Sequence, residues 1–572
     1  MVRLRQLVLV AVGVATMDAC GSPATNPRTT ASPMSASSPA FKQSDLSARE
    51  RARHALNRLA FGPRPGDVEA VASMGVDKWI ARQLDAESIP EHGVGLLTSL
   101  QSQTRTTADL VADYPTQAEV NMLLRPKGAN NQILTPPPGV DSALLRRVQT
   151  RQNQINAQVY PAKMIRAISS DRQLLEVMTN FWENHFSVYS GKAIPYALDQ
   201  YDREVIRPHA LGKFRDLLSA VARSPEMMFY LDNWDSAVDT LHANADERIR
   251  VMRRLASPDS DARAFARLPH RRFVANGLNE NYARELMELH TLGVDGGYSQ
   301  QDVIAVARAF TGWSIDTPAL GAKFLYRPEW HDADAKVILG HALAPGRQME
   351  DGEEVLRILA ASPATARFIT TKLARHFIAD DPPASVVDRC SKAYLSSDGD
   401  IRETMRCIVT GPEFFSRAAY GAKVKTPFEL VASTIRAVGG VGDTTQRLPQ
   451  QAARLGQPIF GRSTPDGWPD RGEDWLNSGA VLNRINFALA VASGAIPGSR
   501  PADWPFAAAL RTASRDQQVR AVAHDLLGDD VSPETIQALE SGSVKTPTSG
   551  ANLTGLPAVV GLALGSPEFQ HR

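Results

Sequence analysis

Hydrophobic positions recur at spacings of three and four residues along most of the chain, which is the pattern of amphipathic helices. Alternation of apolar and polar residues is rare, and the best candidates for a short β-hairpin lie at 323–340. We therefore expect a mainly α fold, a large globular array of helical hairpins. The segments with helical spacing are 46–60, 65–85, 141–158, 161–188, 210–223, 279–292, 300–312, 364–378, 385–396, 400–410, 426–438 and 478–493.

The first 45 residues predict a segment that directs the chain out of the cytoplasm. Residues 1–20 combine a short basic start with an apolar run that is typical of a secretory signal and too short to span a bilayer. Cys20 follows the small Ala19, an arrangement similar to the lipidation site of bacterial lipoproteins, although Asp18 is unusual there. Residues 21–45 are rich in Ser, Pro, Thr and Ala and predict a disordered tether.

This N-terminal pattern predicts an exported cell-envelope protein, either periplasmic or anchored to a membrane through a lipid on Cys20. Ordinary cleavage without lipidation is the alternative. Residues 46–572 are numerous enough for a large helical domain, either undivided or split into two lobes by an irregular insertion near 102–140. Lys and Arg number 63 against 62 Asp and Glu. This balance argues against a nucleic-acid partner.

The chain has three cysteines, and two of them predict a disulfide. Cys390 and Cys407 are equidistant from a turn at Asp398–Gly399, with a helical segment on each side. In an antiparallel helical hairpin these two residues face each other, and an oxidising compartment favours the bond between them. The alternative is a pair of buried thiols, because packed helices can hold their Cα atoms too far apart.

The segment 279–313 carries the densest group of candidate functional residues. At helical spacing, Asn281, Arg284, Glu285 and Glu288 share one face. In a close pair of carboxylates one group has a raised pKa, which suits general acid–base catalysis. The alternative is an internal ion network, because Arg284 and Glu288 are spaced for an i, i+4 pair.

Two histidines are further candidates. His185 lies in the apolar stripe of the helix at 171–189, where a histidine must bond or ligate something, most often as a satisfied core residue. His331 and Asp332 are weak candidates for metal ligands, since the chain has neither HExxH nor paired CxxC motifs.

The loop at 458–475 is rich in aromatic residues and proline. Aromatic side chains dominate the energetics of binding interfaces, which makes Trp468 and Trp475 candidates for contacts with a substrate or partner. The alternative is a lid that packs over the helical core.

The chain resembles a bacterial family catalogued as domain of unknown function 1800. The resemblance covers about residues 46 to 572 and includes FWENHF at 181–186 and NENYARELMELHTLGV at 279–294. Other matching segments are 56–71, 203–218, 364–383, 423–431, 456–470 and 475–490. The resemblance implies an exported bacterial protein, often encoded beside a second exported family numbered 1501, and implies no accepted activity, cofactor or catalytic residue.

Two classes of function therefore stay open. The expected one is a binding or assembly component of the cell envelope, with an exported protein of the family numbered 1501 as partner. The alternative is an enzyme in which Glu285 and Glu288 act with His185 or His331, while Asn281 or Arg284 holds a polar group. Carboxylates sealed from solvent and paired to arginines would exclude this enzyme.

Overall fold

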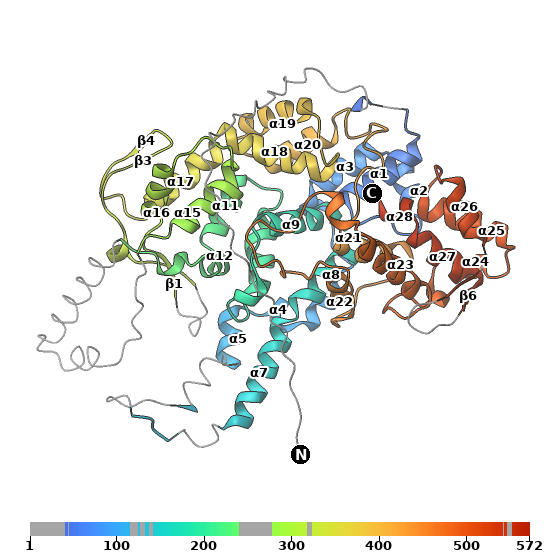
Figure 1. The fold of residues 1–572 in the computed structure, drawn as a ribbon, viewed down its shortest axis with the longest axis horizontal. Helices are drawn as coiled ribbons and strands as arrows, with labels where there is room; N and C mark the ends of the chain where they lie inside the picture. Colours follow the sequence, from blue (N-terminus) through green and yellow to red (C-terminus); the bar gives the residue numbers. More distant parts are fainter. Residues whose placement is uncertain are drawn as a thin grey trace, which may run out of the picture. The chain divides into compact units, whose positions relative to one another are not determined.

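The computed structural model describes residues 41–43, 45–114, 124–125, 132–135, 141–238, 277–316, 323–541, 543–545 and 552–572 (Figure 1). The predicted signal segment, Cys20, most of the predicted tether and part of the predicted insertion lie outside these ranges. Within the described ranges, no helix has both the length and the apolar character that crossing a membrane requires.

The prediction of a mainly α fold is confirmed. In the first half of the chain the helices are α1 (Ala48–Leu59), α2 (Asp67–Met74), α3 (Val76–Leu84), α4 (Gln101–Thr104), α5 (Thr107–Asp113), α7 (Ser142–Asn156), α8 (Val159–Ser169), α9 (Gln173–His185), α10 (Ala197–Gln200), α11 (Phe214–Ala222), α12 (Pro225–Tyr230), α15 (Glu280–Met287) and α16 (Gln300–Ala309). Three π-helical turns extend other helices: η5 (Tyr201–Ile206), η8 (Glu288–Leu292) and η13 (Ala523–Leu527).

The second half continues as helices with short connections. They are α17 (Glu350–Ala361), α18 (Pro363–Phe377), α19 (Ala384–Ser396), α20 (Ile401–Val409), α21 (Pro427–Ala437), α22 (Arg447–Arg454), α23 (Ser478–Ala492), α24 (Ala507–Leu510), α25 (Arg515–Val522), α26 (Pro533–Glu540), α27 (Gly555–Gly565) and α28 (Pro567–Gln570).

Local chemistry sets where several of these helices begin. Ser299 and Thr426 each accept a hydrogen bond from the backbone N–H three residues on, and the acidic side chain at that position bonds back to the cap. These reciprocal bonds satisfy N–H groups that the first helical turn leaves free. In α21 the returning acid is Glu429, which also lies beside the candidate site described below.

Neighbouring helices pack in pairs around a large apolar core, and the described residues also form two smaller apolar clusters. α15 packs on α16, while α18, α19 and α20 lie side by side (Figure 1). Distant segments also meet, since α23 packs along α27. Trp182 on α9 is fully buried in this core, where its indole N–H donates to the carbonyl oxygen of Ala210 at 2.9 Å.

The short strands pair differently from the predicted hairpin. β2 (Phe324–Tyr326) pairs antiparallel with β1 (Trp313–Ile315), and β3 (Lys336–Ile338) pairs with β4 (His341–Leu343). The two candidate segments at 323–340 are therefore strands, but each takes a partner outside the predicted hairpin. A third small ribbon joins β5 (Ser543–Lys545) to β6 (Asn552–Thr554). Alternation over so few residues identifies strands without identifying their partners.

Cys390 on α19 and Cys407 on α20 form a disulfide, with their Cα atoms 5.6 Å apart. The chain reverses between the helices at Asp398 and Gly399, whose φ angles of 54° and 69° lie in the left-handed region. The bond therefore clamps the α19–α20 hairpin across a sequence separation of 17 residues.

Replacing both Cys390 and Cys407 by Ala should lower the free energy of unfolding by about 3 kcal/mol. A crosslink that closes a loop of this length restricts the unfolded chain by roughly that amount. Chemical denaturation of the variant and of oxidised wild type would measure the difference, and reduced wild type should match the variant. Equal stability of all three samples would contradict this role.

Candidate functional site

A cavity of about 70 Å³ lies between α9, the N-terminal end of α21 and the loop 456–475. Its walls combine aromatic rings with charged side chains of both signs. The aromatic residues are Phe181, Phe428, Phe460, Trp468 and Trp475, and the charged ones are Lys163, Glu183, Lys423, Glu429, Arg462, Asp470 and Arg572. Most pockets for small ligands have such apolar walls with a few polar groups.

The loop 456–475 is fastened to α9 through Asn184. The Asn184 side chain donates to the carbonyl oxygen of Trp468 at 2.9 Å and accepts from the N–H of Trp468 at 2.7 Å. Elsewhere, the N–H of Ser190 donates to the carbonyl oxygen of Phe460, and the N–H of Gly472 donates to Asp380, both at 2.8 Å. These bonds fix both ends of the loop, so the cavity has a defined wall on this side.

The two candidate tryptophans lie next to each other in the cavity wall. Their ring centroids are 6.0 Å apart, and the indole N–H of Trp475 donates to the carbonyl oxygen of Pro469 at 3.2 Å. Trp475 is buried and Trp468 is half-buried. The loop thus packs over the core and also lines a cavity, which combines the two alternatives drawn from the sequence. Contact of either tryptophan with a ligand stays a prediction.

Lys163 on α8 and Glu183 on α9 form a buried ion pair at one side of the cavity. The Nζ atom of Lys163 lies 5.2 Å from the ring centroid of Phe460 and 5.7 Å from that of Phe428. Burial lowers the pKa of Lys163 to about 8, although the charge of Asp202 raises it. Lys163 thus presents a buried amine to the cavity beside two aromatic rings.

A second group of charged residues also lines the cavity. Arg572 Nη2 lies 3.0 Å from Glu429 Oε1, and the other oxygen of Glu429 accepts from the N–H of Thr426 at 2.8 Å. His376 Nε2 lies 3.9 Å from Glu429, and burial holds the pKa of His376 well below its usual value, so this imidazole is neutral. Lys423 pairs with Asp380. The cavity thus offers donors and acceptors that are already oriented by each other.

A buried ion network supports the Lys163 side. The side chain of Asp202 in η5 accepts from Arg166 at 3.0 Å and from Arg207 at 3.2 Å, and Arg207 also pairs with Glu176 on α9. Burial raises the pKa of Asp202, but the charges of Arg207 and Arg166 outweigh it and keep the carboxyl ionised. The network joins α8, on which Lys163 lies, to α9 and η5.

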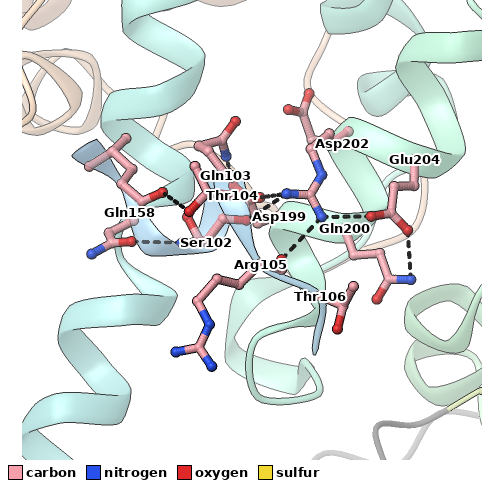
Figure 2. Close-up of polar contacts among 12 residues, drawn as sticks. Ser102, Gln103, Thr104, Arg105, Thr106, Gln158, Asp199, Gln200, Asp202 and Glu204 are labelled. Atoms are coloured by element: carbon pink, nitrogen blue, oxygen red, sulfur yellow. Dashed lines mark hydrogen bonds and ion pairs between the residues drawn. The ribbon is translucent and has the colours of Figure 1, made fainter. Parts of the chain in front are cut away.

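Figure 2 shows the outer edge of this network, where η5 meets α4. Arg203 donates to the carbonyl oxygens of Ser102 at 2.9 Å and Arg105 at 3.3 Å, and to the carboxylate of Glu204 at 2.6 Å. Burial, reinforced by the neighbouring Asp202 carboxylate, raises the pKa of Asp199 to about 7. The bonds from Arg203 cap the C-terminal end of α4 and hold it on η5.

The Glu285–Glu288 face is only partly exposed, and the predicted Arg284–Glu288 pair does not form. Arg284 instead donates to Gln300 on α16 at 2.7 Å, and Glu288 accepts from the hydroxyl of Tyr298 at 3.1 Å. Among the described residues, neither glutamate forms an ion pair with an arginine. Burial, and then the charge of Glu288, raise the pKa of Glu285. The carboxylates are therefore half-buried, and no arginine of the described ranges seals them into an ion network.

Asn281, the fourth residue of this face, is exposed. It lies one turn before Glu285 on α15, and no described hydrogen bond joins it to either glutamate. Its role in holding a polar group stays a prediction.

His185 has other partners than these glutamates. Its Nε2 donates to the carbonyl oxygen of His290 at 3.0 Å, while its buried Nδ1 has no hydrogen-bond partner among the described residues. Burial holds the pKa of His185 well below its usual value, so the ring is neutral. The side chain lies among Phe181, Trp182 and Phe186.

His331 and Asp332 belong to a separate ion network. Arg308 donates to both oxygens of Asp332, at 2.7 and 3.0 Å, and His331 Nδ1 donates to the carbonyl oxygen of Thr311 at 2.8 Å. Within the described ranges, no cluster of three or more His, Cys, Asp and Glu side chains has the arrangement of a metal site. No described hydrogen bond or ion pair joins His185 or His331 to the glutamate pair, and a site shared by these residues stays a prediction.

The sequence reasoning missed most of the cavity's charged residues. Lys163 and Glu183 are 20 positions apart, and Glu429 and Arg572 are 143 positions apart. Neither pair can therefore be predicted from local spacing in the sequence. The available signal was indirect, because Glu183 and Glu429 lie within segments that carry the family resemblance.

A model of a protein family described as "Protein of unknown function (DUF1800)" matches residues 54–571. This match spans nearly the whole chain, and the chain belongs to this family. Searches of curated proteins and of solved structures found no match.

Gly467→Ala should destabilise the loop 456–475 by about 1–3 kcal/mol. Gly467 has a φ of 75°, and a Cβ there would overlap the carbonyl oxygen of Asn184. Gly456→Ala is the matched control, because Gly456 also has a positive φ but has open space around its Cα. Thermal unfolding of both variants would separate the clash from the conformational cost, and equal losses would show that the close approach to Asn184 is unimportant.

Proposed function

We propose that this DUF1800 protein is an exported, lipid-anchored component of the cell envelope that binds a small polar group in the cavity beneath the loop 456–475. Its N-terminal segment, with an apolar signal and Cys20, supports export and anchoring. Binding would serve envelope assembly, with an exported protein of the family numbered 1501 as a further partner.

The observation that carries this proposal is the combination of groups around the cavity. The indoles of Trp468 and Trp475 offer flat apolar surfaces, while Lys163, Glu183 and Glu429 offer charged donors and acceptors. A ring-shaped ligand with hydroxyl or amide groups satisfies both kinds of wall, because its faces pack on aromatic rings while its edges form hydrogen bonds. The sugar units of envelope glycans have this chemistry.

The size of the cavity limits how much of such a ligand enters. Its volume of about 70 Å³ holds several water molecules, each of which needs roughly 10–15 Å³ by this measure. The cavity therefore accepts one substituent or one end of a sugar unit, and the remainder of a glycan chain would lie outside.

We expect N-acetylglucosamine oligomers to change the intrinsic tryptophan fluorescence of the full chain in a saturable way. Trp468→Ala should weaken this binding at least about tenfold, because it removes a half-buried aromatic wall. Fluorescence titration and isothermal titration calorimetry would measure the affinity.

Trp504→Phe is the matched control for this titration. Trp504 is buried outside the cavity, and its replacement should leave the affinity unchanged. Absence of saturable binding by wild type, or equal affinity in the Trp468→Ala variant, would contradict a sugar site at this loop.

An enzyme that uses Glu285 is the second candidate function, and the raised pKa of this half-buried carboxyl supports it. A carboxyl with a raised pKa can hold a proton closer to neutral pH and act as a general acid. Tyr298 and Glu288 would orient a polar group next to it. His185 and His331 are engaged elsewhere and take no part in this form of the proposal.

Glu285→Gln should leave the melting temperature at pH 7 unchanged or slightly higher, and should abolish any turnover. Because folding raises the pKa of Glu285, its favourable contribution is complete below the unfolded value near 4.5 and is lost as the pH rises through the folded value. Any rise in melting temperature that Glu285→Gln gives over wild type should therefore become smaller toward pH 4. Thermal unfolding between pH 4 and 8 would measure it.

Glu280→Gln, on the same helix, is the control for this series. If the melting temperature at pH 7 falls by several degrees in Glu285→Gln but not in Glu280→Gln, Glu285 is a partner in a buried ion pair. That outcome would exclude the enzyme proposal based on this carboxyl.

A further inference from the structure

A second cavity, of about 160 Å³, lies between α1, the loop that precedes α2, η13 and α28. It is separate from the tryptophan-lined cavity, since the two share no lining residue. Its walls carry the cations Arg49, Arg53, Arg64 and Lys425 together with the rings of Phe506 and Phe569.

Lys425 is the exceptional residue of this cavity. Its side chain is only 4% exposed, and its Nζ lies 3.8 Å from the ring centroid of Phe569. Among the described residues, its Nζ has no hydrogen bond and no carboxylate within ion-pair distance. Lys423, two positions earlier, shows the usual arrangement, with an ion pair to Asp380 and a bond to the carbonyl oxygen of Asp470. A buried ammonium group without an anion is costly.

Two of the other cations, Arg53 and Arg64, are held by carbonyl groups, whereas Arg49 pairs with Glu69 and Asp529. Arg53 donates to the carbonyl oxygens of Leu526 at 3.1 Å, His524 at 2.9 Å and Asp525 at 3.0 Å. Arg64 donates to the carbonyl oxygen of Ile168 at 2.6 Å. Neutral acceptors fix these guanidinium groups without cancelling their positive potential.

The carboxylates in the same walls are already occupied. Glu568 accepts from the hydroxyls of Ser532 at 2.7 Å and Thr535 at 2.9 Å, and Glu69 pairs with Arg49. Asp525 Oδ1 lies 2.9 Å from His524 Nδ1. The wall therefore supplies no free counter-ion for Lys425.

The surroundings of Lys425 also change the pKa of its amine. Burial lowers the pKa of Lys425 to about 7, the charge of Glu429 raises it, and the charge of Arg53 lowers it. An anion placed beside Nζ would stabilise the protonated form.

We propose that this second cavity binds a compact oxyanion, the phosphate or carboxylate group of a small molecule, and that Lys425 is its principal contact. Arg53 and Arg64 add positive potential at the site, while Phe506 and Phe569 offer apolar contacts to the rest of the molecule. The inference does not depend on sugar binding at the other cavity.

Thermal shift and isothermal titration calorimetry with inorganic phosphate and with acetate, at constant ionic strength and pH 7, test this proposal. Wild type should show a saturable rise in melting temperature. The anion that binds with the higher affinity identifies the class of oxyanion. Lys425→Met should raise the melting temperature without added anion, since it removes an unpaired buried charge, and should weaken binding at least about tenfold. Lys425→Arg should retain binding.

Lys78→Met is the matched control, because Lys78 is exposed and lies outside the cavity. An unchanged anion response in Lys425→Met, or no saturable response to either anion in wild type, would overturn the proposal. A measurement on wild type covers the case in which the variant does not fold. Bound phosphate or acetate should protect Lys425 from acetylation, read by peptide mass spectrometry, and equal labelling of Lys425 with and without anion would also overturn it.

Discussion

The buried carboxylate of Asp202 is the constraint on which the candidate site depends. It is fully buried between the guanidinium groups of Arg166 and Arg207, and thereby joins α8 to η5. Arg207 extends the connection to Glu176 on α9. Lys163 lies one turn before Arg166 on α8, and Glu183 lies two turns after Glu176 on α9. The Lys163–Glu183 pair that lines the cavity therefore lies on the same two helices as this network. Loss of one member would leave a buried charge unpaired, at a cost of about 3–5 kcal/mol.

The extended segment before α21 relates the two cavities to each other. Lys423 and Lys425 are two positions apart, and each backbone N–H donates to a carbonyl oxygen in the C-terminal segment, that of Arg572 and that of Gln570. Nevertheless Lys423 lines the first cavity and Lys425 the second. Lys423 has two polar partners, whereas Lys425 lies over an aromatic ring. The same short segment thus carries one lysine that is satisfied within the fold and one that is not.

Periodicity predicted the fold well because helices are encoded locally. The segment 300–312 became α16, and 426–438 became α21, each with its cap at a Ser or Thr that the sequence displays. The partners of individual side chains were harder to predict, because they depend on contacts between residues that are distant in sequence. Arg284 has the right spacing for Glu288, yet Gln300 on the adjacent α16 is its partner. The aromatic loop identified Trp468 and Trp475 as a group, whereas the charges around them come from helices far apart in sequence.

The attachment of the loop 456–475 to Asn184 has a kinetic consequence. The loop is held by two bonds between the Asn184 side chain and the backbone of Trp468, and by further bonds at Phe460 and Gly472. The first cavity is therefore formed before any ligand arrives. Entry then requires no loop opening, and the association rate would increase linearly with ligand concentration without a conformational plateau. Differences in affinity among ligands would arise from how quickly each one leaves.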